Sequence, residues 1–192
     1  MTHRPAVAVA AALTAATLAL MPTSASGGAD TDRRAVPTIR IVQDGADRAT
    51  QLVDATRMTL RSAPERGRRA SVVVAIPEGL VAGNNVVFHI NTDTDPTPEI
   101  AYFGAVSSEF QGYRMKSWTR TGTELPFSCG RMRAAMGETW TRLAFNPLCI
   151  NKGVWSFSVS FNLIAGEDSL PRQDEWLPGV RKFSGRVKAF AG

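Results

Sequence analysis

The sequence predicts an all-β protein, an antiparallel β-sandwich or jelly roll of roughly eight to ten strands with one disulfide. Three observations predict this fold. Short segments alternate apolar with polar residues, turn-forming residues separate these segments, and no segment of useful length combines helical periodicity with capping residues. The sequence also has no internal repeat of fixed period, so a solenoid or propeller is not indicated.

Three strands are predicted in the first part of the domain. Residues 38–41 alternate isoleucine with polar side chains and predict a short strand. Residues 52–61 show a clearer alternation, which places Arg57 and Arg61 on one face. A Pro-Glu-Arg-Gly turn follows, and residues 71–76 are rich in β-branched side chains. The second and third segments are therefore predicted to form a hairpin.

The middle of the chain predicts two central strands joined by an acidic loop. In residues 86–91 the polar His89 and Asn91 share the face opposite to the apolar side chains. Residues 100–106 are apolar on both faces, as expected for a strand that is covered on both sides. A further strand is predicted at residues 111–120.

A hairpin is predicted next. Residues 131–136 and 139–145 alternate in character and flank Gly137-Glu138, a connection of the kind that glycine at positive φ permits. The sequence therefore predicts that these two strands are neighbours.

The C-terminal part contains the clearest single strand, residues 154–164. The side chains predicted to point inward are Trp155, Phe157, Val159, Phe161 and Leu163, and those predicted to point outward are Ser156, Ser158, Ser160 and Asn162. Residues 166–179 are predicted to be a long polar loop that carries Trp176. A last strand is predicted at residues 182–190.

The N-terminal residues predict export. A short basic start precedes an apolar run at residues 6–21, and small residues follow, so residues 1–25 are predicted to be a signal peptide cleaved after Ala25. Residues 26–37 are predicted to be a flexible leader, and residues 38–192 a single β-sandwich domain. The apolar run is short for a membrane span, and no cysteine lies near the cleavage position. We therefore expect a secreted protein without a lipid anchor or a membrane span.

The chain has two cysteines, Cys129 and Cys149. Both lie in the domain that is predicted to be exported, where oxidising conditions favour a disulfide. Counting outward from Gly137-Glu138 brings both cysteines to the open end of the predicted hairpin. The disulfide is therefore predicted to clamp the base of the hairpin, in a structural role, because no C-x-x-C motif is present to indicate redox chemistry.

Asp93, Asp95 and Glu99 are the candidate metal ligands, and Ca²⁺ is the candidate cofactor. Carboxylates gathered on a short loop are the hard oxygen ligands that Ca²⁺ takes, and Asn91 and backbone carbonyls could complete the shell. The alternative is that Asp93 and Asp95 form Asx-turns that shape the loop. The loop lacks the glycine and the additional aspartate of D-x-D-G-D-G-x-x-D calcium loops, which favours the alternative.

Basic and aromatic side chains alternate on two predicted strands and form a candidate ligand-binding face. Its residues are Arg114, Lys116, Trp118, Arg120, Arg131, Arg133, Trp140 and Arg142. If the strands lie side by side, the face suits an anionic glycan or cell-wall polymer, because aromatic rings stack on sugars and arginine pairs with carboxylate or phosphate. The net charge of +5 permits such a partner. The alternative is cation–π packing of arginine stems on a solvated sheet.

Residues suited to catalysis are few. His89 is the only histidine after the predicted signal peptide, and we expect it to be a solvated surface side chain. Neither G-x-S-x-G nor H-E-x-x-H occurs, and a carboxylate pair such as Asp93 and Glu99 is too common to indicate a glycosidase. No catalytic residue is predicted, and a hydrolase is the least favoured function.

Three short motifs carry a resemblance to a group of small secreted bacterial proteins. These motifs are Asp93-Thr94-Asp95 with Pro98-Glu99, the cysteine pair, and Trp176-Leu177-Pro178-Gly179 followed by Phe183. In that group a D-T-D loop ends one strand and a W-L-P-G segment precedes the last strand. The resemblance spans most of the domain and implies a β-sandwich of unassigned function.

These observations predict a secreted, non-catalytic binding module for an extracellular or cell-envelope ligand. The alternative is a secreted protein-interaction or inhibitor protein that uses residues 166–179, with Trp176 as a lid, a partner anchor or a plug over the sandwich end. Nucleic acid is not expected as a partner, because an exported chain without an RNA-binding motif gives little reason to expect one.

Overall fold

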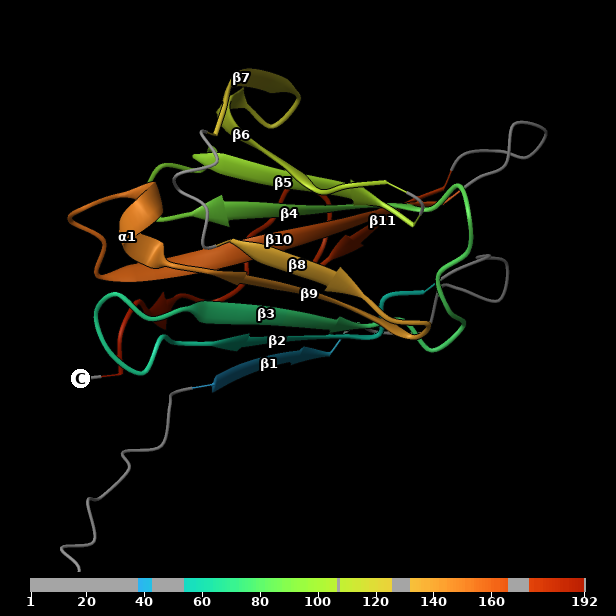
Figure 1. Cartoon of the computed structure of the whole chain (residues 1–192), viewed down its shortest axis with the longest axis horizontal. Coiled ribbons are helices and arrows are strands. Elements are labelled where there is room, and N and C mark those ends of the chain that lie inside the picture. The colour runs from blue at the N-terminus through green and yellow to red at the C-terminus, as the bar shows by residue number, and fades with distance from the viewer. Residues whose placement is uncertain (1–37, 43–53, 107, 126–131, 166–172, 192) are drawn as a thin grey trace, which may run out of the picture. The chain divides into compact units, whose positions relative to one another are not determined.

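Two antiparallel sheets pack face to face in the computed structural model, which confirms the all-β sandwich class (Figure 1). The structure describes residues 38–42, 54–106, 108–125, 132–165 and 173–191. The chain divides into two units, residues 1–33 and residues 34–192, and every described residue belongs to the second. The predicted signal peptide and leader therefore lie outside the described residues.

The first sheet has five strands in the order β1-β2-β3-β9-β8. Their bounds are β1 Thr38–Val42, β2 Arg57–Arg61, β3 Ala70–Ala75, β9 Trp140–Phe145 and β8 Arg133–Met136. The predicted hairpins β2–β3 and β8–β9 are both present. The connection that the local sequence does not reveal is the pairing of β9 with β3, which joins the two hairpins into one sheet.

The second sheet has seven strands, with the order β11-β10-β4-β5-β6-β7 and with β12 also paired to β10. Their bounds are β11 Gln173–Leu177, β10 Ser156–Ala165, β4 Asn85–Asn91, β5 Ile100–Ala105, β6 Gln111–Ser117, β7 Arg120–Glu124 and β12 Val187–Lys188. The predicted central pair is β4 and β5, and β4 lies between β5 and β10. β6 and β7 form one edge of this sheet, beyond β5 (Figure 1).

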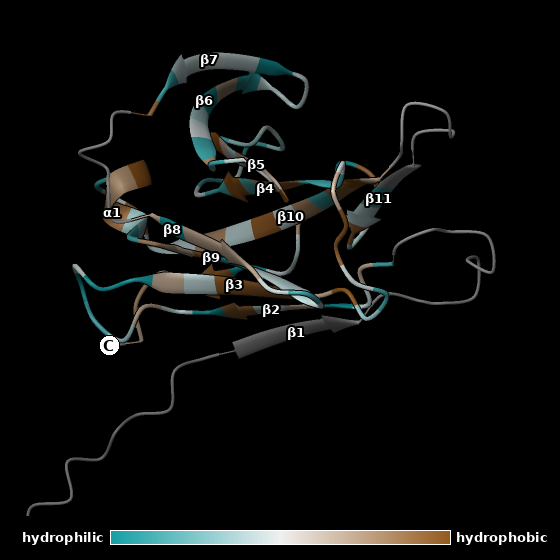
Figure 2. Cartoon of the chain, turned by 45° about the vertical axis from the view of Figure 1, so that its right-hand side comes forward, coloured by the Kyte–Doolittle hydropathy of each residue, from teal (hydrophilic) through white to brown (hydrophobic). Residues whose placement is uncertain are grey.

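The core lies between the two sheets and follows the predicted alternation. In β10 the apolar side chains of Phe157, Phe161 and Leu163 are fully buried, and Figure 2 shows hydrophobic and hydrophilic segments in turn along this strand. The ring centroids of Phe145 on β9 and Phe157 on β10 are 5.1 Å apart in an edge-on arrangement, so the two sheets meet directly there.

Trp155 is a correction to the predicted core. The sequence pattern placed this indole inward, but it is 85% exposed, because β10 begins at Ser156 and the alternation does not extend to the residue before it. Val154, one residue earlier, is buried instead. The pattern of alternation was therefore extrapolated one residue too far.

Three of the residues predicted to point outward on β10 are also buried. Ser158, Ser160 and Asn162 face away from the core, as their alternation predicts, yet they are shielded from solvent. The outer side of the second sheet is therefore covered around these positions, by side chains described below.

The structure also changes several predicted bounds. The strand predicted at residues 111–120 is two strands, β6 and β7, with a turn at Trp118 and Thr119. The polar loop predicted at residues 166–179 contains strand β11, and the last predicted strand shortens to β12. β11 is polar at Gln173, Asp174 and Glu175, so its sequence lacks the alternation of a half-buried strand.

The C-terminal segment touches both sheets. β12 pairs with the beginning of β10 in the second sheet. Just after it, the N–H of Ala191 donates to the carbonyl of Ala63 at 2.8 Å, and the N–H of Ala63 donates to the carbonyl of Ala189 at 3.1 Å. Ala63 follows β2 of the first sheet, so this segment fastens the two sheets at one end.

The helical content of the described residues is small. Helix α1 covers Pro147–Ile150, and Asn146 caps it by accepting the N–H of Leu148 at 3.1 Å. Among the described residues, no helix has the length and apolar character needed to cross a bilayer.

Candidate functional site

The predicted ligand-binding face does not form as one surface. Arg114, Lys116, Trp118 and Arg120 belong to β6, β7 and their turn in the seven-stranded sheet, whereas Arg133, Trp140 and Arg142 belong to β8 and β9 in the five-stranded sheet. Arg131 lies outside the described residues. The condition that these strands lie side by side is not met, because the chain passes from one sheet to the other between β7 and β8.

The half on the five-stranded sheet joins two arginines that the sequence analysis placed elsewhere. We call the four exposed arginines on the outer side of this sheet, together with Trp140, the arginine face. The arginines are Arg57 and Arg61 on β2, Arg133 on β8 and Arg142 on β9. The alternation in β2 had placed Arg57 and Arg61 on one face, but the pairing of β3 with β9 brings that face beside Arg142.

Strand register arranges the arginine face in rows across the sheet. One row runs Arg61, Ser71, Ala144, Arg133, the next Thr59, Val73, Arg142, Ala135, and the third Arg57, Ala75, Trp140. With strands spaced about 4.8 Å apart and alternate residues about 7 Å apart, neighbouring arginines of the face are on the order of 8–14 Å apart. These rows contain no carboxylate in the part of the chain that the structure describes.

The guanidinium groups of the arginine face are not engaged by the described residues. None of these four arginines makes a hydrogen bond or an ion pair within the described ranges. An ion pair is described for another arginine, Arg68 in the loop between β2 and β3, which binds Glu65 at 2.8 Å. As far as the described residues are concerned, each guanidinium of the arginine face keeps its five N–H donors for an external acceptor. The face can therefore present several forked donors to one anionic molecule at the same time.

Trp140 supplies an apolar surface beside these cations. Its side chain is 40% exposed. The indole lies over Gly137, and a Cβ atom at residue 137 would collide with it, so the glycine is needed for this position of the ring. Arg142 lies two residues further along the same strand, which puts a cation next to the ring on the same face.

The second predicted site, the acidic loop, has the geometry of consecutive Asx-turns. Oδ1 of Asp93 accepts the N–H of Asp95 at 2.8 Å, and Oδ1 of Asp95 accepts the N–H of Thr97 at 2.7 Å. The hydrogen bond from Thr97 holds the pKa of Asp95 below its ordinary value. These contacts match the Asx-turn alternative, in which the carboxylates shape the connection between β4 and β5.

Glu99 is held in a different way. Its Oε2 accepts the N–H of Thr92 at 2.8 Å, so it ties the end of the loop to its beginning. Burial is the largest cause of a raised pKa at Glu99, and the side chain of Asp93 raises it further, whereas the N–H of Thr92 acts to lower it. Within the described ranges, no group of three or more His, Cys, Asp or Glu side chains is arranged to hold a metal ion. Calcium binding by Asp93, Asp95 and Glu99 stays a prediction.

Asn91 is a central residue of this loop that the sequence analysis did not single out as such. It is 1% exposed, and its Nδ2 donates to the carbonyls of Asp95 and Thr97. Its Oδ1 accepts from Arg186. The only sequence signal was its position on the polar face of β4 at the entrance to the loop.

An aromatic cluster covers the outer side of the seven-stranded sheet. It consists of His89, Trp118, Trp176 and Phe183. The His89 ring is 5.2 Å from that of Trp118 and stacks on that of Trp176 at 5.5 Å, and Phe183 lies 4.7 Å from Trp118. Nε1 of Trp118 donates to the carbonyl of Pro96 at 3.0 Å, so the cluster also supports the acidic loop. Trp118 is therefore a packing residue, apart from the exposed basic residues of β6 and β7.

His89 is not the solvated surface histidine that the sequence analysis expected. It is 3% exposed, because the cluster covers the polar face of β4 on which it lies. Burial lowers its pKa to about 4, so the imidazole is neutral near pH 7. Ser160 is its neighbour on β10, and neither His89 Nδ1 nor Ser160 Oγ has a hydrogen-bond partner among the described residues.

The structure describes one of the two cysteines that are predicted to form a disulfide. Cys149 lies in α1, and Cys129 lies outside the described residues. The pairing of Cys129 with Cys149 stays a prediction.

Comparison with known proteins gives no family assignment. No family model matches the chain, and no curated protein is significantly similar to it.

Proposed function

We propose that this protein is a secreted, non-catalytic binding module whose arginine face holds an anionic glycan or cell-wall polymer. The observation that carries the proposal is the grouping of four exposed arginines with Trp140 on one side of the five-stranded sheet. In the described part of that face no carboxylate neutralises them. Of the eight residues first predicted for this role, Arg133, Trp140 and Arg142 are kept. Arg57 and Arg61 join them on the same surface.

A polymer suits this surface better than a small anion. One exposed ion pair contributes about 1 kcal/mol or less, so a single arginine gives little affinity. Four arginines spread over three rows can hold successive charges of one chain, and each contact after the first is intramolecular. The exposed side of Trp140 gives a sugar ring a surface on which to stack.

The burial of His89 also supports a role without catalysis. A hydrolase that used this histidine would need the imidazole in contact with its substrate, yet the side chain lies beneath Trp118 and Trp176. The alternative function, an interaction or inhibitor protein using residues 166–179, loses an exposed anchor, because Trp176 packs on His89 and Trp118.

Affinity for polymers of defined charge tests the proposal. Polygalacturonate carries carboxylates, teichoic acid carries phosphates, and dextran is neutral. The variant R57Q/R61Q/R133Q/R142Q should bind the preferred anionic polymer about tenfold or more weakly, because it loses four forked donors. All four side chains are exposed, so folding should be retained.

The matched control is R114Q/K116Q/R120Q, which removes three exposed cations from the other sheet. It should change the affinity by about twofold or less, which reflects net charge alone. Equal losses in the two variants, or binding of dextran as tightly as the anionic polymers, would refute a specific arginine face.

A further inference from the structure

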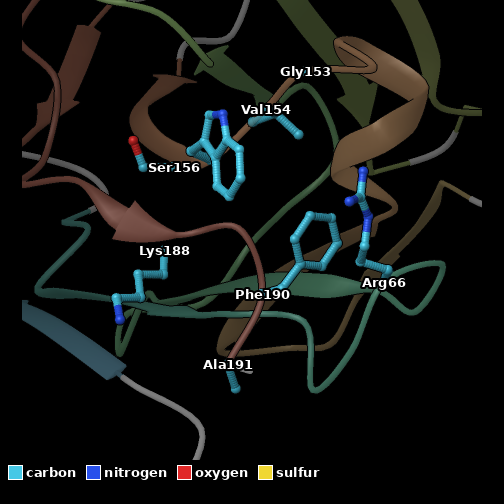
Figure 3. A pocket seen from close by; sticks show the side chains of 8 residues that line it. Arg66, Gly153, Val154, Ser156, Lys188, Phe190 and Ala191 are labelled. Carbon is cyan, nitrogen blue, oxygen red and sulfur yellow. The ribbon is translucent and has the colours of Figure 1, made fainter.

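A cavity of about 630 Å³ opens at the end of the sandwich that the C-terminal segment fastens. Three segments line it: the β2–β3 loop, the residues between α1 and β10, and the C-terminal segment. Its lining includes Arg66, Val154, Trp155, Ser156, Lys188 and Phe190 (Figure 3). Its size is typical of pockets that enclose a small molecule or one unit of a polymer.

The cavity offers an indole as a stacking surface. Trp155 lines it and is 85% exposed, which is far more than an indole with a packing role would be. Phe190 adds a second ring, half-buried, and Val154 closes the floor with a buried apolar side chain. A ring-shaped ligand with an apolar side could therefore stack on the exposed face of Trp155.

Two cations complete the lining. Arg66 lies beside the ring of Phe190, with its Cζ 5.8 Å from the ring centroid, and Figure 3 shows the guanidinium next to this ring. Lys188 lines the cavity from β12. In the described part of the chain, Arg66 has no hydrogen-bond partner and the cavity lining contains no carboxylate. The cavity is therefore suited to an anion, with Arg66 held by Phe190 in a position to receive it.

Ser156 gives the cavity a hydroxyl with a defined orientation. Its Oγ accepts the Nε–H of Arg186 at 2.8 Å, and its backbone carbonyl accepts a second N–H of the same guanidinium at 2.9 Å. The hydroxyl is thereby fixed as an acceptor towards Arg186, and its own proton can be donated to a ligand oxygen. A ligand hydroxyl can accept this proton, a contact that an aromatic acid without a hydroxyl group cannot make.

We propose that this cavity binds a sugar ring that carries a carboxylate, as in a uronic acid. The apolar side of the ring stacks on Trp155, the carboxylate pairs with the fork of Arg66, and a ring hydroxyl accepts from Ser156. Because Trp155 is so exposed, the sugar can stay linked to further units outside the cavity. This site shares no residue with the arginine face and does not depend on it.

The test uses three small probes and the intact secreted chain. Methyl glucuronide carries the ring and the carboxylate, methyl glucoside has the same ring without the charge, and benzoate has the charge on an aromatic ring. Binding is followed through the indole N–H signal of Trp155 in two-dimensional NMR. Glucuronide should bind about tenfold or more tightly than either of the other two, since only it satisfies all three contacts.

Substitutions assign the binding to this cavity. Trp155→Ala and Arg66→Gln should each weaken glucuronide binding by about tenfold, with ligand signals used in place of the indole signal for the first variant. The matched controls Arg114→Gln and Arg120→Gln each remove an exposed guanidinium from β6 or β7, outside both proposed sites. They should leave glucuronide binding unchanged.

Each unfavourable result has a defined meaning. Benzoate or glucoside binding as tightly as glucuronide would overturn the proposed ligand class, and full binding by Trp155→Ala and Arg66→Gln would overturn the site. Polymer binding that is lost in R57Q/R61Q/R133Q/R142Q while glucuronide binding persists would keep the two proposals separate.

Discussion

Arg186 donates a hydrogen bond of 2.9 Å from Nη1 to Oδ1 of Asn91, across 95 positions of the sequence. The same guanidinium donates to the carbonyl of Asp93 and to Oγ and the carbonyl of Ser156. One side chain therefore ties the acidic loop, which follows β4, to the beginning of β10. Asn91 passes the constraint on, because its Nδ2 holds the carbonyls of Asp95 and Thr97.

Asn91→Ala should lower the free energy of unfolding by about 2–3 kcal/mol, because it leaves buried donors and acceptors without partners. Asn91→Asp should cost a comparable amount, since a carboxylate cannot donate to the two loop carbonyls. Urea denaturation measures both. Arg186 is exposed, so Arg186→Gln should cost less, about 1 kcal/mol. A loss at Arg186 larger than that at Asn91 would contradict this order.

The acidic loop gives a second prediction. Asp93→Asn and Asp95→Asn should each leave the melting temperature nearly unchanged, because an amide oxygen can accept the same backbone N–H. Asp93→Ala and Asp95→Ala should each lower the melting temperature by more than the matching Asn variant does, because a side-chain to backbone hydrogen bond is lost.

Calcium distinguishes the two explanations of this loop. If the carboxylates only shape the turn, millimolar Ca²⁺ should raise the melting temperature of the wild type by no more than it raises that of the Asn variants. A calcium-dependent rise that disappears in Asp93→Asn would show that the loop binds the metal, as the sequence pattern first suggested.

His89 makes stability depend on pH in a particular window. Its pKa in the folded state is about 4, below the ordinary value of 6.5, so the unfolded chain takes up a proton at a higher pH than the native state does. The free energy of unfolding should therefore fall as the pH drops from about 6.5 to about 4, by an amount on the order of 3 kcal/mol, and level off below that.

The control for this prediction is His89→Gln, which cannot titrate. Carboxylates titrate in the lower part of the same window, so the quantity to follow is the difference between wild type and variant, measured by denaturation at a series of pH values. A difference that stays constant between pH 7 and pH 4 would show that the imidazole is not buried in a neutral form.

Truncation should reverse the roles that the sequence predicted for two tryptophans, Trp155 in the core and Trp118 on the surface. Trp118→Ala should destabilise the fold by about 2–3 kcal/mol, because the ring packs on His89, Trp176 and Phe183 and donates to Pro96. Trp155→Ala should change stability by less than about 0.5 kcal/mol, because the ring is exposed. Thermal unfolding measures both, and similar losses would contradict the described packing.

The sequence was most informative about which side of a strand a residue faces. The alternation around Phe88 and Phe161 predicted their burial, and their ring centroids are 5.1 Å apart in the core. Alternation is a property of one strand, so it does not say which strand lies next to it. Arg57 and Arg142 share a sheet because β3 pairs with β9, a contact between distant segments that no local pattern records.

The sequence also could not predict that the outer side of the second sheet is covered. His89, Ser160 and Asn162 follow the pattern of solvent-facing residues, and they are buried only because residues far along the chain fold over them. Trp118 shows the same limit, since alternation alone could not distinguish a strand position from the turn between β6 and β7.

The fastening of the two sheets by the C-terminal segment constrains how the chain can be made. β12 fills part of the edge of β10, and Ala189 and Ala191 bond to Ala63 beside the first sheet. A chain that emerges gradually from a ribosome or a translocation pore cannot make these contacts until residue 191 has emerged. Until then the beginning of β10 keeps an unpaired edge, which leaves the incomplete domain exposed to proteases and to edge-to-edge association.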